Sequence, residues 1–240
     1  MRGGSVGCPA HQASRPSIPE PISSSPSKAK QPPSIWFLTI FNLMARPKLT
    51  YKRNTKAEII KAATVIAQTK GFHALTYQDL ADKLKIRKAS IHYYFPNKVD
   101  LGVDILESTG VWFNGWCQEL QEKKFPPLKK IEAYFNFFHF ISGKGSRICP
   151  CGAFSIVWPI LPGKLQKAVR RLTVSQIKWL KATLHEGRVS GDIVKMGTLD
   201  EQAQIILASL QGGLQTSRTQ GDPRYFEEIT RHLFNLLRRR

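Results

Sequence analysis

Side chains that can donate hydrogen bonds to phosphates and to nucleotide bases are concentrated in residues 76–98, TYQDLADKLKIRKASIHYYFPNK. Phosphates attract positive donors, and base edges in a DNA major groove accept and donate hydrogen bonds to polar side chains. On a helix over about residues 87–94, the side chains expected to face outward are Arg87, Lys88, Ser90, His92 and Tyr93. This pattern favours contact with nucleic acid. The alternative is a small solvated helix whose charges only keep it soluble.

Two short helices joined by a tight turn would position these side chains. Thr76 can cap the first helix, and Asp79, three residues later, can accept from the exposed amides of its first turn. Ile86 and Ile91 would turn inward, and Pro96 would end the second helix. The first helix also has a buried stripe of Leu80, Ala81 and Leu84.

A longer helix is expected before this pair. The residues 55–58, Thr-Lys-Ala-Glu, have the pattern of a capping box, and Lys70 followed by Gly71 is a typical helix end. Between them, apolar residues recur at helical spacing, at Ile59, Ala62, Ala63, Ile66 and Ala67. The sequence therefore predicts three consecutive helices, of which the last two form a helix-turn-helix.

The order of residues in these three helices resembles the DNA-binding domain of the TetR family of transcriptional regulators. The matching positions are Gly71-Phe72, Thr76, Asp79-Leu80-Ala81, the run Lys88-Ala89-Ser90-Ile91-His92-Tyr93-Tyr94-Phe95, Asn97-Lys98 and Leu101. The resemblance implies an all-α protein with an N-terminal three-helix helix-turn-helix domain and a larger C-terminal helical domain for ligand binding and dimerisation. It also implies a cytoplasmic protein.

By this resemblance, the residues expected to approach base edges are Lys88, Ala89 and Ser90, and those expected to hold phosphates are Thr76, His92, Tyr93 and Lys98. The chain departs from the common pattern at Lys85, where glycine is frequent, and at Arg87, where a small capping residue is frequent. Arg87 is therefore a further candidate for a phosphate contact. His92 stands where a tyrosine is often found.

Positive charge is densest around this motif. The chain has 36 Lys and Arg against 17 Asp and Glu, a net charge of +19. Residues 44–98 contain 12 basic and 3 acidic residues, a net charge of +9, whereas residues 99–240 contain 20 and 13, a net charge of +7. A basic arm before the first helix is expected to follow the DNA backbone or to enter a minor groove, through Arg46, Lys48, Lys52 and Arg53. The alternative is a solubilising tail.

Changes in composition divide the chain into three parts. Residues 1–43 are rich in Pro and Ser, and we expect them to be a disordered or non-native extension upstream of a start at Met44. Residues 44–98 are expected to form the DNA-binding domain, and residues 99–240 the effector-binding and dimerisation domain. The apolar run at residues 35–43 is too short to span a bilayer, so no membrane partner is expected.

The second domain is predicted to be helical throughout. The helices expected from apolar spacing cover residues 100–123, 128–142, 153–158, 163–186, 199–218 and 222–239. The last two, Leu199–Arg218 and Asp222–Arg239, are expected to form a homodimer, because Gly212 and Gly213 would allow close helix approach. Packing within one chain is the alternative.

Aromatic residues of this domain are candidates for an apolar effector pocket, namely Trp112, Trp116, Phe135, Phe138, Phe154, Trp158 and Trp179. For each of them, filling of the core is the alternative. Cys149 and Cys151 are a candidate thiol sensor, because nearby amides and Arg147 would lower a thiol pKa. The alternative is a pair of buried, idle cysteines. Too few ligands surround them for zinc, so neither a metal nor a cofactor is expected.

These features predict a ligand-responsive, sequence-specific DNA-binding transcriptional regulator. We expect a repressor that is released from double-stranded operator DNA by a small hydrophobic or aromatic effector. Thiol-based redox or electrophile sensing through Cys149 and Cys151 is the alternative regulation, and a non-specific DNA-coating protein is a further alternative. No enzymatic activity is expected, because the histidines are scattered and no catalytic motif is present.

Overall fold

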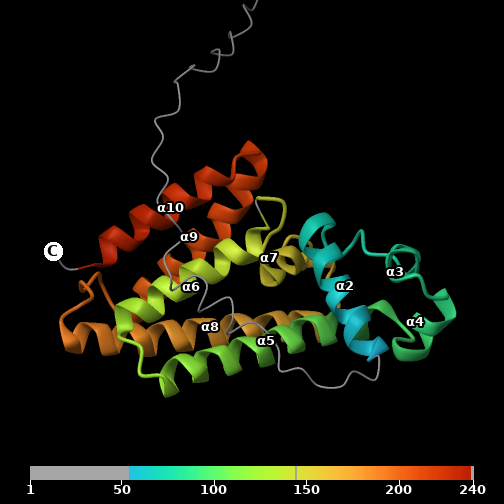
Figure 1. Cartoon of the computed structure of the whole chain (residues 1–240), viewed down its shortest axis with the longest axis horizontal. Coiled ribbons are helices and arrows are strands. Elements are labelled where there is room, and N and C mark those ends of the chain that lie inside the picture. Colours follow the sequence, from blue (N-terminus) through green and yellow to red (C-terminus); the bar gives the residue numbers. More distant parts are fainter. Residues whose placement is uncertain (1–53, 144, 239–240) are drawn as a thin grey trace, which may run out of the picture. The chain divides into compact units, whose positions relative to one another are not determined.

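Helices make up most of residues 54–143 and 145–238, which are the residues that the computed structural model describes (Figure 1). Within these residues there is no strand, and one isolated antiparallel bridge joins Ile193 to Arg238. The predicted all-α fold class is confirmed. The predictions for residues 1–43 and for the basic arm at residues 46–53 lie outside the described residues.

The first three described helices are α2 (Thr55–Lys70), α3 (Tyr77–Leu84) and α4 (Lys88–Tyr94). They enclose a small apolar core of Ile59, Ala63, Leu80, Ile91 and Phe95. The predicted capping box at the start of α3 is present, because the Thr76 hydroxyl accepts from the Asp79 amide and the Asp79 carboxylate accepts from the Thr76 amide.

The predicted capping box at Thr55 is wrong. Asn54 caps α2 instead, with its side-chain oxygen accepting from the Ala57 amide at 3.2 Å, and Thr55 is the first helical residue. Asparagine is among the strongest N-cap residues, so the cap one position earlier is used. The turn between α3 and α4 departs from the usual pattern as expected: Lys85 has left-handed geometry at φ 54°, and Arg87 makes no side-chain cap.

The rest of the described chain forms a bundle of long helices with two short ones among them. They are α5 (Lys98–Glu122), α6 (Pro127–Ser142), α7 (Pro150–Ser155), the 3-10 helix η1 (Trp158–Ile160), α8 (Gly163–Ser190), α9 (Leu199–Gln220) and α10 (Pro223–Leu237). The prediction of a helix over residues 153–158 is wrong in its bounds. α7 begins at Pro150, because proline fits the first turn of a helix, and Trp158 begins the separate helix η1.

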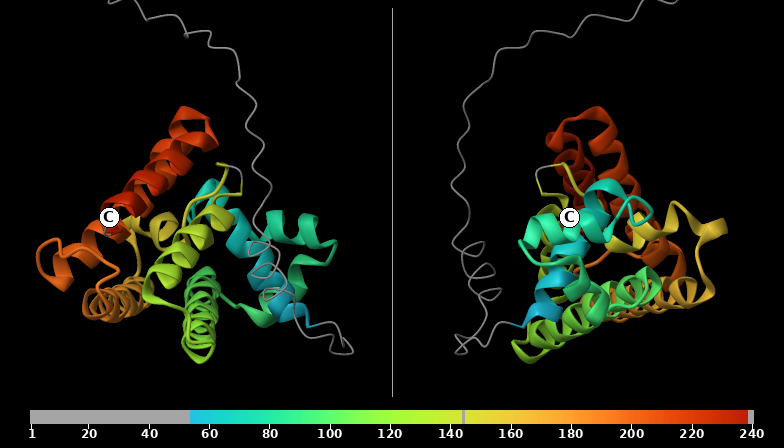
Figure 2. Two further views of the ribbon diagram at one scale, coloured as in Figure 1. Left: turned by 60° about the vertical axis from the view of Figure 1, so that its left-hand side comes forward. Right: turned by 90° about the vertical axis from the view of Figure 1, so that its right-hand side faces the viewer.

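Helix α8 runs along both α5 and α9, and α10 folds back on α9 (Figures 1 and 2). Gly213 lets α9 and α10 approach closely, since a Cβ there would lie 3.0 Å from the ring of Phe226. At the other end of the bundle, the buried ammonium of Lys130 on α6 donates to Glu186 on α8 at 2.6 Å. The bundle thus holds α5 and α9 in fixed positions relative to α8.

Helix α5 also packs on α2, so it is shared by the first three helices and the bundle. Lys56 on α2 forms an ion pair of 2.7 Å with Asp104 on α5. At Gly102, α5 lies directly against Phe72 and Leu165, where a Cβ would come within 2.8 Å of both side chains. A displacement of α5 within the bundle would therefore also displace α2.

Candidate nucleic-acid interface

Most side chains of helix α4 are exposed, and few of them are buried against the rest of the protein. Ile91 is its one buried residue, and Phe95, which follows the helix, is buried as well. Tyr93 is 81% exposed, Ser90 is half-buried, and the other outward-facing residues are Arg87, Lys88, Ala89 and His92. The structure therefore presents the predicted polar face of α4 to the outside.

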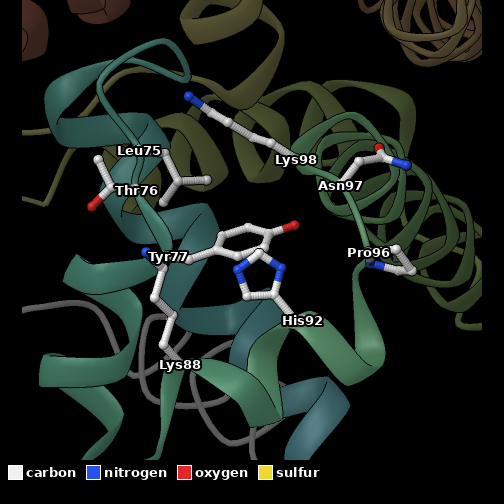
Figure 3. A pocket seen from close by; sticks show the side chains of 8 residues that line it. All are labelled: Leu75, Thr76, Tyr77, Lys88, His92, Pro96, Asn97 and Lys98. Carbon is white, nitrogen blue, oxygen red and sulfur yellow. The ribbon is translucent and has the colours of Figure 1, made fainter.

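A hollow of about 300 Å³ lies beside α4 (Figure 3). It is lined by Leu75, Thr76, Tyr77, Lys88, His92, Pro96, Asn97 and Lys98. In Figure 3 the Lys88 side chain extends from α4 toward the start of α3, and both Lys88 and Thr76 line the hollow. Imidazole and ammonium groups around one hollow suit an anion such as a DNA phosphate, whereas the Thr76 hydroxyl already donates to the Asp79 carboxylate at 2.6 Å.

The aromatic wall of this hollow is fixed by packing. The His92 ring lies edge-on to the ring of Tyr77, with 4.7 Å between the centroids. Tyr77 is buried, and its hydroxyl donates to the carbonyl of Phe95 at 2.8 Å. Burial raises the pKa of Tyr77 to about 12, so the phenol stays protonated as this donor. His92 is thereby oriented by a side chain that the sequence did not single out.

Lys98 has a protein partner that the sequence did not predict. Its ammonium donates to the carbonyl of His73 at 2.7 Å and lies 5.0 Å from the centroid of the Phe72 ring. Burial lowers its pKa below the ordinary lysine value. The ammonium points away from His92 (Figure 3). Lys98 thus joins the start of α5 to the segment between α2 and α3, while its charge remains at the edge of the hollow.

The cations of this surface are not neutralised by acidic side chains. Among residues 54–143 and 145–238, no ion pair involves Lys83, Lys85, Arg87 or Lys88. Asp79, the nearest acid at the start of α3, is occupied by its capping contacts, and the Thr76 hydrogen bonds lower its pKa. The α3–α4 surface therefore keeps its positive charge for an anionic partner.

Comparisons with known proteins agree with this geometry. The family model "Bacterial regulatory proteins, tetR family" matches residues 59–103, which span α2 to the start of α5. A TetR-family regulator structure from Agrobacterium tumefaciens is 28% identical and covers 77% of this chain and 97% of that chain, with a TM-score of 0.70. A TetR regulator structure from Legionella pneumophila is 24% identical and covers 79% and 100%, with a TM-score of 0.71.

The chain belongs to the TetR family. It is a DNA-binding transcriptional regulator of TetR type, with a helix-turn-helix formed by α3 and α4. It is also similar to the "HTH-type transcriptional repressor DhaR" of Mycobacterium sp. (strain GP1), with 21% identity over 164 residues, which are 66% of this chain and 80% of that protein. In the described part of this TetR-family chain, no helix has the length and apolar character to cross a membrane.

Most of α9 in this TetR-family regulator carries no charge on its outward face. Between Gln202 and Ser217 the helix has no acidic or basic residue. Its exposed residues there are small, polar or apolar, and include Gln204, Ile205, Ala208, Gly212, Gln215 and Thr216. On α10, Tyr225 and Leu236 are exposed. Gly213 is used for packing within the chain, but a Cβ at Gly212 would meet nothing within 4 Å. The last predicted dimer residue, Arg239, lies outside the described residues.

The predicted effector residues do not share one place in the structure. Trp116 and Trp179 lie against Tyr134, and Trp112 stacks on Trp116. Phe138 joins them through an edge contact of 5.1 Å with Tyr134. The other three lie elsewhere. Phe135 faces Phe234 of α10 at 6.2 Å, Phe154 stacks on Phe72 at 4.3 Å, and Trp158 lies 5.0 Å from the guanidinium of Arg170.

Other residues of the aromatic cluster were missed. Phe113 and Phe137 pack between the tryptophans, and the buried Tyr134 hydroxyl donates to Gln176 of α8 at 2.9 Å. Burial raises the pKa of Tyr134 well above its ordinary value. A polar glutamine on the buried side of α8 was the available sequence signal, because buried amides need partners. The cluster therefore combines flat apolar surfaces with one internal hydrogen-bonded pair.

The two cysteines of the predicted thiol site are both buried, at the start of α7. Arg147 lies against Gly143 and does not contribute to the pKa of either thiol. Within the described residues, no group of His, Cys, Asp and Glu is arranged to hold a metal ion.

Proposed function

We propose that this chain is a dimeric, sequence-specific repressor that binds double-stranded operator DNA and is released by a small hydrophobic or aromatic effector. One observation carries the proposal. The exposed face of α4 and the hollow beside it combine cations that form no ion pair within residues 54–143 and 145–238 with hydroxyl, phenol and imidazole groups. They lie on a helix held by a single buried residue. This surface is suited to phosphates and base edges together.

Each side chain has a role that follows from its position. Lys88, Ala89 and Ser90 lie in the first turn of α4 and would approach base edges. Thr76, Arg87, His92 and Tyr93 would hold phosphates. Lys98 would act mainly through its bond to His73, which positions the start of α5, and its charge would add to the local field. The arm residues Arg46, Lys48, Lys52 and Arg53 would extend the contact along the DNA.

Dimerisation would occur through α9 and α10. The sixteen residues 202–217 of α9 include no charged residue, so their exposed face is suited to burial, since buried charges are costly unless paired. Gly212 leaves space that this chain does not fill, which suits the close approach of a second copy. Two copies would place two α4 helices on paired half-sites and so raise specificity.

Effector binding would take place at the aromatic cluster on α5, α6 and α8. Planar apolar surfaces and the Tyr134–Gln176 pair suit a small aromatic molecule that has one polar group. The cluster includes Trp112 and Trp116 of α5, the helix that also packs on α2. A ligand that favours one position of α5 would shift the population of DNA-binding arrangements. Repression is supported by the likeness to DhaR, which is named a repressor.

The test is fluorescence anisotropy of the purified full chain with DNA from the intergenic region upstream of its own gene. At physiological salt, specific binding should survive competition by scrambled duplex, because specific affinity typically exceeds non-specific affinity by ~10³ or more. Lys88→Ala should weaken binding by about 5- to 150-fold and should reduce the slope of log affinity against log salt by about 1 if it holds a phosphate.

Lys167→Ala is the matched control, because Lys167 is an exposed cation on α8, outside the helix-turn-helix. It removes the same charge and should leave the affinity nearly unchanged. Equal competition by scrambled and upstream DNA would instead indicate a non-specific DNA-coating protein. Equal losses in both variants would mean that only net charge matters.

A further inference from the structure

Helix α7 touches the first three helices at both of its ends. Just before it, the amide of Ile148 donates to the carbonyl of Gln68 in the last turn of α2, at 3.1 Å. Near its other end, Phe154 stacks on Phe72 with 4.3 Å between ring centroids and 21° between the planes. Residues Pro150 to Phe154 are all buried. A change in α7 would therefore be transmitted directly to α2.

The two thiols lie at the start of α7, and Cys151 bonds to helix α8 of the bundle. The Cys151 sulfur accepts from the side-chain amide of Gln176 at 3.5 Å and from the hydroxyl of Thr173 at 3.8 Å, both on α8. Gln211 of α9 lies against the same turn, because a Cβ at Gly152 would come within 2.9 Å of its side-chain oxygen. The thiol pair thus lies where α7 meets α8 and α9, and α7 itself also contacts α2.

The two sulfurs are chemically different. The hydrogen bond from Cys151, then the Gln211 side chain and the amides at the start of α7, hold the pKa of Cys149 below its ordinary value despite burial. The same contact and burial raise the pKa of Cys151 well above the ordinary value. Cys149 is therefore the better nucleophile, with a protonated thiol beside it. Cys117 on α5 differs from both, because burial raises its pKa to about 12.

We propose that Cys149 and Cys151 form a redox modification site, at which a small hydroperoxide converts the two thiols to a disulfide and so loosens the contact of α7 with α2. Its effect on transcription rests on the proposed DNA-binding function. Small oxidants are favoured because the two residues are only 3% and 4% exposed. The position at the α2–α7 contact is what distinguishes this pair from idle buried cysteines.

The reaction proceeds in two steps. The Cys149 thiolate attacks the terminal oxygen of the hydroperoxide, so that an S–O bond forms, the O–O bond breaks, and the leaving alkoxide or hydroxide takes up a proton. Cys151 sulfur then attacks Cys149 sulfur. An S–S bond forms, the S–O bond breaks, and the hydroxide leaves as water with the proton of Cys151. Two thiols lose two electrons, and the peroxide is reduced to an alcohol, or water, plus water.

The disulfide changes the first turn of α7. Cys149 is the N-cap of α7, and Cys151 is the second helical residue after it. Bonding them draws the cap residue toward the helix and shifts the Cys151 sulfur, which accepts from Gln176 and Thr173 of α8. Ile148, whose amide bonds to α2, is the residue directly before Cys149, so its position changes as well.

The experiment treats the full chain with hydrogen peroxide and measures two quantities. Peptide mass spectrometry should find the segment that contains residues 149–151 lighter by two hydrogens. Anisotropy with upstream DNA should find an affinity lowered by about 5- to 150-fold, the usual range for coupling between sites, and restored by dithiothreitol. Cys149→Ser and Cys151→Ser should bind DNA with an affinity that peroxide does not change. Cys117→Ser is the matched control and should respond like the unmodified chain.

Two results would overturn the inference: no disulfide between Cys149 and Cys151 under peroxide, or a disulfide that leaves DNA affinity unchanged. The two readouts separate this inference from the proposed function. If the untreated chain does not distinguish its upstream DNA from scrambled duplex, the proposed function fails, and mass spectrometry alone decides whether the pair is a modification site.

Discussion

Replacement of Gly102 by alanine would test the contact at which α5 meets both α2 and α8. A Cβ at this position would lie 2.8 Å from Leu165 Cδ2 and 2.8 Å from Phe72 Cζ. Both side chains are buried, and Phe72 is held by its stack on Phe154. Neither can move aside without disturbing its neighbours, so the added methyl group must strain this contact.

The magnitude follows from two opposing effects. Extra volume in a packed core typically costs about 1–3 kcal/mol. Alanine in place of glycine within a helix gains about 1 kcal/mol. Gly115→Ala on the same helix is the matched control, because a Cβ there meets nothing within 4 Å and only the gain remains. The helix-propensity effect cancels in the comparison, so Gly102→Ala should be less stable than Gly115→Ala by about 1–3 kcal/mol.

Urea unfolding followed by circular dichroism would measure this difference as a free energy of unfolding. For a chain of this size, thermal unfolding should show midpoints that differ by about 2–4 °C for each kcal/mol. Gly102→Ala should also change DNA affinity or effector response, because the strained contact lies between α5 and α2. If both variants are equally stable, α5 does not pack at Gly102 as described, and the inferred transmission through this contact is refuted.

Three further predictions concern other elements. Gly212→Ala should strengthen α9 within one chain but weaken the dimer if a second copy packs there, and analytical ultracentrifugation that finds an unchanged dimer constant would contradict the proposed interface. Thr76→Ala should lower the free energy of unfolding by about 1 kcal/mol through loss of the cap at Asp79, and should also weaken DNA binding. Burial lowers the pKa of His139, which bonds to Thr230 at 2.8 Å, so stability should fall as pH drops below the ordinary histidine value near 6.5 and level off below the folded-state pKa. In denaturant titrations between pH 8 and 5, His139→Gln should lack this part of the pH dependence, and an identical pH profile would show that His139 is not the group responsible.

Local sequence patterns predicted most of the helices, because their cause is local. The cap at Thr76, the stop at Pro96 and the periodic apolar residues of α8 and α9 each act within a few residues. The wrong prediction of the α2 cap has a local cause as well. Asn54 and Thr55 compete for the same cap, and the pattern alone did not decide between them.

The partners of individual side chains could not be predicted in the same way. The bond from the Lys98 ammonium to the carbonyl of His73, a group 25 residues away in sequence, was not predicted. Phe154 was grouped with the tryptophans, but it stacks on Phe72. Both depend on how α5 and α7 pack on α2. Aromatic periodicity indicates that a side chain is buried but does not indicate which helix it faces.

The sequence by itself determined that the chain is helical, that a helix-turn-helix occupies residues 77–94, and that the positive charge is densest there. It could do so because helix propensity, capping and charge depend on residue type and short-range spacing. Only the tertiary structure decided that α7 joins the thiol pair to α2, that Gly213 serves packing within the chain while Gly212 remains open, and that four of the seven predicted aromatic residues form one cluster. These contacts join residues far apart in the chain, and they exist only because the helices pack in one particular arrangement.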